Sequence, residues 1–343
     1  MKRGLALIAA ALIALAAVAA AGAKSNDTTI TGAGSTFVQP LVAAWTPALG
    51  KAFGYTVQYS GVGSGAGIAA ITANQVDFGA SDAPLTPAQQ SACQDCIQIP
   101  WALSAVAVAY NFKGSPAHLN LDGSTLSKIF LGEITKWDDP AIVALNKGAN
   151  LPSTTITPIF RADGSGTSYA FTDYLSAVNG TWKTKIGTST QPAFPAGQGA
   201  KGSSGVAGLI SRTDGAIGYV DVAYAIKNHI HFAAVRNAAG HFLFPSLRRI
   251  QAAALAFTKV PANNEMHIVN PPKSAATGYP ISTYTYIVVH SSTPHAAELR
   301  KMIFWALTTG QTAPFAAKLT FANMATVHSV LIAAEKTLKK IHT

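Results

Sequence analysis

Short β-rich runs alternate with helical periodicity along most of the chain, and this alternation limits the possible folds more than any other feature. Two segments, 37–49 and 171–178, carry apolar residues at the three- and four-residue spacing of amphipathic helices. Strands are expected at residues 55–59, 76–78, 103–110, 156–160, 217–220 and 284–289. Segments 187–205 and 260–280 are rich in Gly, Pro, Ser, Thr and Asn and are expected to be loops. Alternating strands and helices predict an α/β fold.

The N-terminal 23 residues have the pattern of a cleaved secretory signal. Lys2 and Arg3 precede an apolar run at 5–20, and the small residues at 21–23 fit a signal peptidase site. The alternative is a membrane anchor, because the run is near the lower end of spanning length. There is no cysteine near residue 20 to receive a lipid. We therefore expect an exported, non-lipidated protein that resides in the periplasm.

Length and charge exclude several classes of protein. The 343 residues suggest about two domains, and the formal net charge of +10 is spread without any run of like charges. A nucleic-acid-binding tail is therefore not expected. Cys93 and Cys96 are the only cysteines, so they cannot form a disulfide framework, and no second pair completes a zinc site. They form either one short disulfide or two thiols, and no metal or cofactor is expected.

Three predicted strand-to-helix junctions share one chemistry. Residues 32–37, 61–67 and 163–168 each place glycines and hydroxyls where a helix begins. The first N–H groups of a helix lack partners within it and the helix dipole is positive there, so each junction favours an oxyanion. A single such junction is most often an ordinary N-cap. Three of them, with Arg161 just before the third, predict an anion site.

Two other motifs, a dinucleotide-binding pattern and a hydrolase nucleophile elbow, are alternatives to the anion site. Gly61, Gly63 and Ala66 fit a dinucleotide-binding pattern after a strand, with an acid about twenty residues on. An exported protein has no ready supply of that cofactor, and the other two junctions lack the pattern. Neither Ser64 nor Ser165 lies in G-x-S-x-G, so a hydrolase nucleophile elbow is absent.

Five motifs resemble the phosphate-binding proteins of phosphate ABC transporters, the PstS family. They stand at residues 32–37, 77–85, 137–139, 161–168 and 215–220. The resemblance runs from about residue 31 to 224, and returns more weakly at 279–289 and 303–310. It implies a two-domain type II periplasmic-binding fold with the ligand cleft between the domains. The predicted domains are 24–104 together with 278–343, and 105–277.

The resemblance also implies a ligand set. By position, the family's phosphate ligands are Thr36, Phe37, Ser64, Asp82, Arg161, Ser165, Gly166 and Thr167. Asp163, two residues after Arg161, is expected to orient it, although such a pair is otherwise a common surface salt bridge. Ser35 and Gly65 depart from the residues frequent in the family, and segment 232–272 aligns poorly.

Asp82 is expected to set the selectivity between anions. A hydrogen-bond acceptor at this position suits phosphate, which keeps one or two protons, and repels sulfate, which keeps none. The alternative is that Asp82 caps the turn at Pro84.

The expected function is therefore capture and release of inorganic phosphate, monobasic and dibasic, without chemistry. The implied partners are the permease and ATPase subunits of a phosphate importer, with the binding protein itself a monomer. The alternative is a secreted phosphatase-like enzyme of the same fold, although no metal cluster or activated nucleophile supports it. A surface adhesion or scavenging protein is a third class that the sequence leaves open.

Overall fold

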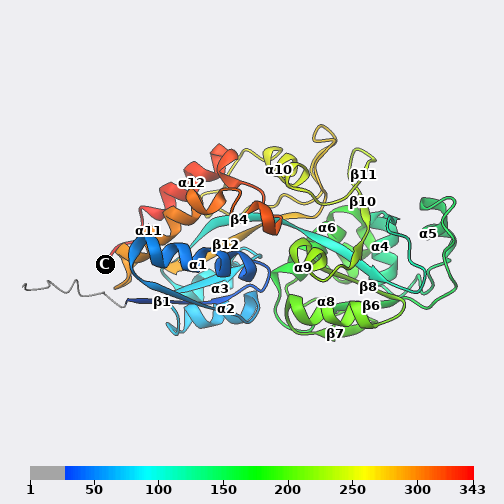
Figure 1. The fold of residues 1–343 in the computed structure, drawn as a ribbon, viewed down its shortest axis with the longest axis horizontal. Coiled ribbons are helices and arrows are strands. Elements are labelled where there is room, and N and C mark those ends of the chain that lie inside the picture. The colour runs from blue at the N-terminus through cyan, green and yellow to red at the C-terminus, as the bar shows by residue number, and fades with distance from the viewer. Residues whose placement is uncertain (1–27) are drawn as a thin grey trace, which may run out of the picture.

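The computed structural model describes residues 28–343, and it confirms the α/β class (Figure 1). The predicted signal peptide, residues 1–23, lies outside the described residues. None of the helices within 28–343 is long and apolar enough to span a bilayer.

Nine strands form one long sheet, in the order β2-β1-β3-β12-β4-β8-β6-β7, and β9 pairs with β4. Its strands are β1 (Thr29–Gly34), β2 (Thr56–Gly61), β3 (Phe78–Ser81), β4 (Cys96–Asn111), β6 (Thr157–Arg161), β7 (Gln198–Ala200), β8 (Ala216–Asp221), β9 (His231–Phe232) and β12 (Ser282–His290). A smaller sheet has the order β11-β10-β5. Its strands are β5 (Asn120–Leu121), β10 (Ala234–Arg236) and β11 (Phe242–Leu243).

Strand β4 joins two halves of the long sheet. Residues 96–105 of β4 pair with β12, whereas 106–111 pair with β8, both antiparallel. We call β1, β2, β3, β12 and residues 96–105 the first half, and residues 106–111 with β6, β7, β8 and β9 the second half. Each half includes the helices that follow its strands. Figure 1 shows β4 running lengthwise from one half into the other. Residues 98–110 are all buried, as a strand covered on both faces requires.

Helices pack on both halves of the sheet and bury its faces. They are α1 (Gln39–Phe53), α2 (Ser64–Thr72), α3 (Pro87–Cys93), α4 (Gly123–Phe130), α5 (Pro140–Leu145), α6 (Gly166–Val178), α7 (Gly180–Lys185), α8 (Gly202–Arg212), α9 (Val222–Lys227), α10 (Leu247–Leu255), α11 (Ala296–Leu307) and α12 (His328–Leu338). In α1, Pro40 occupies the first turn, where its missing N–H costs nothing, and Gly54 ends the helix at φ 74°. The predicted apolar stripe of α1 faces inward, with Trp45 edge-on to Trp101 at 5.3 Å.

Most of the predicted elements are present, with one clear error. Five of the six predicted strands correspond to β2, β4, β6, β8 and β12, and the predicted loop 260–280 contains no helix or strand. The predicted strand 76–78 is placed too early, because β3 begins at Phe78. The predicted loop 187–205 is wrong in part, because it contains β7 and the start of α8. Strand β7 has the sequence Gln-Gly-Ala and pairs with β6 through its backbone, so it has no side-chain periodicity to detect.

The loop 260–280 ties α6, in the second half, to elements of the first half. The Asn264 amide donates to the Gln98 carbonyl at 2.9 Å and to the Thr337 hydroxyl at 2.8 Å. Three residues further on, the His267 ring lies 3.2 Å from an Asp173 carboxylate oxygen on α6 and 3.0 Å from Glu265. This places a histidine between two carboxylates. The hydrogen bond with Asp173 is the largest cause that raises the pKa of His267 to about 9.

Replacing His267 with glutamine is therefore expected to destabilise the protein in a pH-dependent way. A raised pKa means that the charged form is stabilised on folding, so this contribution is complete below the ordinary value of 6.5 and is lost as pH rises through about 9. Thermal melting of wild type and His267→Gln should differ near about pH 6 and converge near about pH 10. An equal difference at both pH values would mean that the ion pair does not contribute.

Cys93 and Cys96 form a disulfide in the structure, with their Cα atoms 5.4 Å apart. Cys93 ends α3 and Cys96 begins β4, and both side chains are buried. The bridge therefore fastens a short helix to the strand that runs through both halves.

Reduction of this disulfide is expected to lower the free energy of unfolding by about 2 kcal/mol, the small value that chain entropy gives for so short a loop. Denaturant unfolding with and without a reductant measures it. The Cys93→Ser/Cys96→Ser variant is the control and should not respond to the reductant. Intact mass after alkylation, with and without prior reduction, reports the bridge itself, and two free thiols in exported material would contradict it.

Candidate anion-binding site

The three junctions meet at one place because parallel strands end at the same edge of a sheet. Strands β1, β2 and β3 run parallel to one another, and β6 runs parallel to β8. β1 leads into α1, β2 into α2 and β6 into α6, as the sequence predicts. The carboxyl-terminal edges of the two halves face each other across a buried contact. In α/β sheets, this edge is where ligands bind.

The first junction contributes Thr36, which lies against the second half. Its hydroxyl is 2.9 Å from the Ser203 hydroxyl and accepts from the Ser203 N–H at 3.1 Å. The Phe37 N–H donates to the Ser35 hydroxyl at 3.0 Å, while the Phe37 ring is buried in the core. Thr36 is therefore a hydroxyl contact between the two halves.

The second junction contributes Ser64, whose hydroxyl joins the two halves directly. It accepts from the Gly166 N–H at 3.0 Å and from the Asp82 N–H at 3.3 Å. Since both bonds use its lone pairs, its proton is available to donate. Beside it, the Gly65 N–H donates to the Gly164 carbonyl at 3.0 Å.

Asp82 follows β3 and lies at the centre of this contact. One carboxylate oxygen accepts from the Ser35 hydroxyl at 2.6 Å and from the Thr285 hydroxyl at 3.0 Å. Burial raises the pKa of Asp82 to about 6, although these hydrogen bonds and the charge of Arg161 partly offset it. The turn before Pro84 is bridged by another residue, Ser81, whose hydroxyl accepts from the Ala83 N–H at 3.1 Å. The position of Asp82 therefore favours a role in the site over one as a turn cap.

Arg161 ends β6 and supplies a buried positive charge. Its side chain is only 2% exposed, and its Nε donates to Asp163 Oδ1 at 2.7 Å while Nη2 bonds to Oδ2. Asp163 also accepts from the Gly202 N–H at 3.1 Å. Burial acts to raise the pKa of Asp163, but the hydrogen bonds from Arg161 and its charge outweigh burial, so the pKa is lowered. The pair is therefore a buried, two-bond contact that fixes the guanidinium plane, not a surface salt bridge.

The third junction supplies the start of α6. The Ser165 hydroxyl caps the helix by accepting from the Ser168 N–H at 3.2 Å. Gly166 is pressed against Asp82, and a Cβ at this position would lie 2.6 Å from the Asp82 nitrogen, so a side chain would not fit. The Thr167 hydroxyl is buried and has no hydrogen-bond partner within residues 28–343. A buried hydroxyl without a partner is costly, which makes Thr167 a donor suited to a ligand.

These groups are hydroxyls, backbone N–H groups and one guanidinium, with a single acceptor, Asp82. Such a set suits an oxyanion that carries a proton. All eight predicted ligand residues, together with Asp163, lie around the contact between the two halves.

Comparisons with known proteins agree with this geometry. The sequence profile of the PBP superfamily domain matches residues 19–308. The phosphate-binding protein PstS of Pasteurella multocida is 39% identical over 292 residues, which cover 83% of each chain. Its counterpart from Xylella fastidiosa (strain 9a5c) is 36% identical, covering 84% of this chain and 80% of that protein. This chain belongs to the PstS family.

The fold also has solved relatives. The structure of a high-affinity periplasmic phosphate-binding protein with bound phosphate superposes with a TM-score of 0.69 at 23% identity, and covers 90% of this chain and 93% of that one. The likeness confirms the type II periplasmic-binding fold that the sequence motifs imply.

Four further residues of this PstS-family chain border the site and were not predicted from its sequence. They are Ser203, Tyr219, Asp221 and Thr285. Asp221 ends β8, next to β6, and burial raises its pKa to about 8. Its Oδ1 accepts from the Tyr224 N–H at 3.2 Å, while its buried Oδ2 has no partner within the described residues. The signal that could have identified Asp221 is an acidic residue directly after the predicted strand 217–220.

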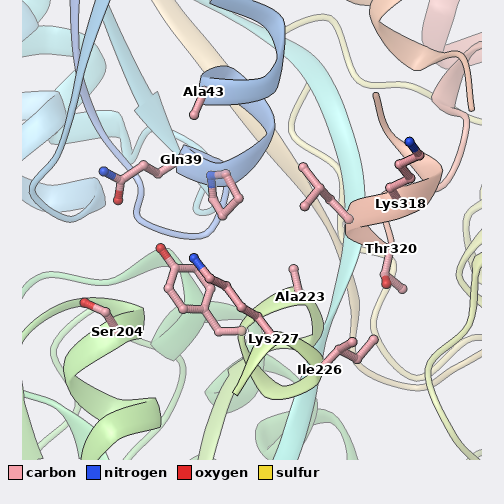
Figure 2. A pocket seen from close by; sticks show the side chains of 11 residues that line it. Gln39, Ala43, Ser204, Ala223, Ile226, Lys227, Lys318 and Thr320 are labelled. Atoms are coloured by element: carbon pink, nitrogen blue, oxygen red, sulfur yellow. The ribbon is translucent and has the colours of Figure 1, made fainter. Parts of the chain in front are cut away.

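A groove of about 550 Å³ opens beside this contact (Figure 2). Gln39 and Ala43 of α1 line one side, and Ser204 and Lys227 line the facing side. None of the predicted ligand residues lines it. The predicted anion site is therefore a buried contact next to the groove, not the groove itself.

Proposed function

We propose that this protein binds inorganic phosphate between the two halves of its sheet and delivers it to an ABC-type import permease. The ligands are the eight residues predicted from the sequence, namely Thr36, Phe37, Ser64, Asp82, Arg161, Ser165, Gly166 and Thr167. Both the monobasic and the dibasic ion carry an O–H group that can donate a hydrogen bond to the Asp82 carboxylate. Asp163 holds Arg161 in position without touching phosphate.

One observation carries this proposal: a buried guanidinium lies at a buried contact made of hydroxyl and N–H donors. A dehydrated anion is stabilised best by such fixed dipoles, because each charge-assisted hydrogen bond contributes roughly 1.5–3 kcal/mol. Arg161 provides the full positive charge, and the unpartnered Thr167 hydroxyl is ready to donate. The curated relatives carry the name phosphate-binding protein, which supports phosphate as the anion.

Calorimetry of the mature protein with phosphate, arsenate, sulfate and molybdate tests the proposal. Phosphate and arsenate should bind and sulfate should not, at two pH values on either side of neutrality. Sulfate binding as tight as that of phosphate would contradict it.

The alternative, a phosphatase-like enzyme, gains no support from relatives that are named as binding proteins. Release of product from a chromogenic phosphate ester is the direct measurement. Turnover that is lost in Ser64→Ala would favour the enzyme.

We further propose that residues 24–104 with 278–343, and 105–277, are two domains that close on phosphate. In support, β4 changes partners between Ala105 and Val106, close to the predicted boundary. The N-terminal signal pattern supports export to the periplasm, and the absence of a cysteine near residue 20 supports a protein without a lipid. In this proposal the protein is a monomer that delivers phosphate to the permease and ATPase subunits of an importer.

Phosphate is expected to compact the protein, because its ligands come from both halves and it binds best when they meet. Small-angle X-ray scattering should show a smaller radius of gyration with phosphate than without it. An unchanged radius, with binding verified by calorimetry, would show that the protein is already closed.

A further inference from the structure

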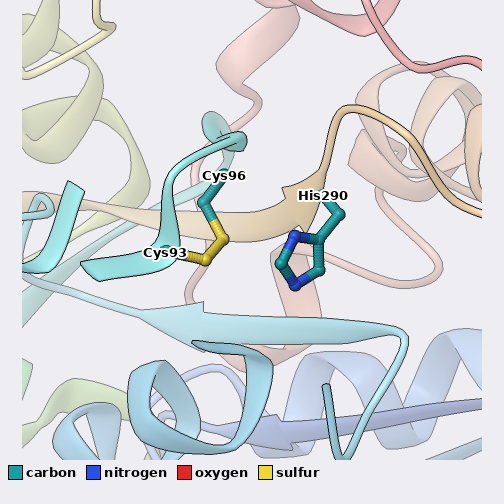
Figure 3. Close-up of side chains that lie close together, drawn as sticks. All are labelled: Cys93, Cys96 and His290. Atoms are coloured by element: carbon teal, nitrogen blue, oxygen red, sulfur yellow. A yellow bond between two sulfur atoms is a disulfide. The ribbon is translucent and has the colours of Figure 1, made fainter. Parts of the chain in front are cut away.

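The folded chain brings a histidine to the Cys-X-X-Cys pair from 194 residues away in sequence. The ligand atoms of Cys93, Cys96 and His290 all lie within 4.8 Å of one another. Figure 3 shows the imidazole of His290 beside the two sulfur atoms, where the end of β12 meets the start of β4. Two sulfurs and one imidazole nitrogen are three of the four ligands of a common type of zinc site.

The His290 ring is oriented as metal-binding histidines are. Its Nε2 lies 2.9 Å from the Ile71 carbonyl oxygen, which can only accept, so Nε2 carries a proton. The lone pair of the neutral ring is then on Nδ1. A hydrogen bond from the other ring nitrogen to a backbone carbonyl is the usual way in which a protein fixes the tautomer of a metal ligand.

A carboxylate lies next to Nδ1. The Asp95 carboxylate lies 2.6 Å from Nδ1, so a cation bound at Nδ1 would lie beside a negative charge. Asp95 is the residue between the two cysteines nearest to Cys96, so the same short loop supplies both the sulfurs and this negative charge. With both thiols ionised, the cluster would carry three negative charges.

The cluster borders a surface pocket. Cys93 and His290 line a surface pocket of about 380 Å³, together with Asp95. The cluster is also separate from the anion site. β12 runs antiparallel to β3, so His290 lies toward the edge of the sheet opposite to Asp82. A ligand at the cysteines therefore does not compete with one at Arg161.

We propose that Cys93, Cys96 and His290 form a redox-gated site for one soft or borderline divalent cation such as Zn²⁺. In the disulfide form the sulfurs are bonded to each other and the site is closed to metal. A small dithiol transfers two electrons to the Cys93–Cys96 bond, breaks it and becomes a disulfide itself, leaving two thiols. The cation then binds both sulfurs and His290 Nδ1, and the two thiol protons pass to solvent.

Titration of the reduced protein with Zn²⁺ alone, in phosphate-free buffer with a chromogenic chelator as competitor, tests the proposal. We expect one equivalent to bind after reduction and none to the disulfide form. Cd²⁺ in place of Zn²⁺ should give the ultraviolet absorption of a metal bound to thiolates. Bound Zn²⁺ should also raise the melting temperature of the reduced protein.

His290→Gln should weaken Zn²⁺ binding by about tenfold or more. Asp95→Asn should also weaken it, because the substitution removes the negative charge beside Nδ1. The matched control is His328→Gln, an exposed histidine on α12, which should bind as wild type does. No Zn²⁺ bound by the reduced wild type, or equal binding by His290→Gln, would overturn the proposal. A melting curve shows whether His290→Gln is folded, and its intact mass after alkylation shows that both cysteines are reduced before the titration.

Discussion

Arg161→Met is expected to weaken phosphate binding by about 3 kcal/mol, equivalent to a factor of about 150 in Kd. The guanidinium is 2% exposed and is the full positive charge that we assign to the site, so its loss leaves a dehydrated anion without a counter-charge. The substitution also leaves Asp163 beside the site without its partner, which adds a repulsive charge. Calorimetry with phosphate measures the change.

Two comparisons separate this effect from general basicity and from misfolding. Arg212→Met removes the same charge from an exposed position on α8 and should leave phosphate affinity unchanged. Arg161→Lys keeps the charge but loses the two-bond contact with Asp163, so its affinity should lie between wild type and Arg161→Met. A melting curve shows whether each variant is folded. Equal losses in Arg161→Met and Arg212→Met would show that overall charge, not this site, holds the anion.

Asp82→Asn is expected to retain much of the affinity for phosphate while relaxing the rejection of sulfate. An ionised Asp82 can only accept hydrogen bonds, so it suits a protonated phosphate and opposes the unprotonated oxygens of sulfate. Asparagine offers a donor in its place. A competition titration of phosphate against sulfate measures the selectivity, and Asp138→Asn, an exposed acid, is the matched control. Unchanged selectivity in Asp82→Asn would make Asp82 a purely structural residue.

The pH dependence of selectivity gives a second measure of the same role. Burial raises the pKa of Asp82 to about 6, so the carboxyl gains a proton as pH falls through this value and can then donate to sulfate. Selectivity for phosphate over sulfate should therefore decline below about pH 6 in wild type. It should change much less over the same range in Asp82→Asn, which has no carboxyl to titrate.

The sequence by itself determined the features that are local in the chain. The α/β class followed from periodicity, since apolar spacing reports directly on which face of each element is buried. The three junctions were visible because a strand, a glycine-rich turn and a helix start are contiguous. The motif at 161–168 placed Arg161, Asp163 and Ser165 within five residues of one another, so their proximity did not depend on the rest of the fold.

Only the tertiary structure decided which distant residues meet. Thr285 reaches Asp82 across 203 positions because β12 inserts between β3 and β4, and a buried threonine in an apolar strand gives no sign of its partner. His290 approaches the cysteines for the same reason, at the C-terminal end of the same strand. Sequence periodicity tells which face of a strand is buried, but strand order decides what that face touches. That order is set by long-range pairing, which no local pattern records.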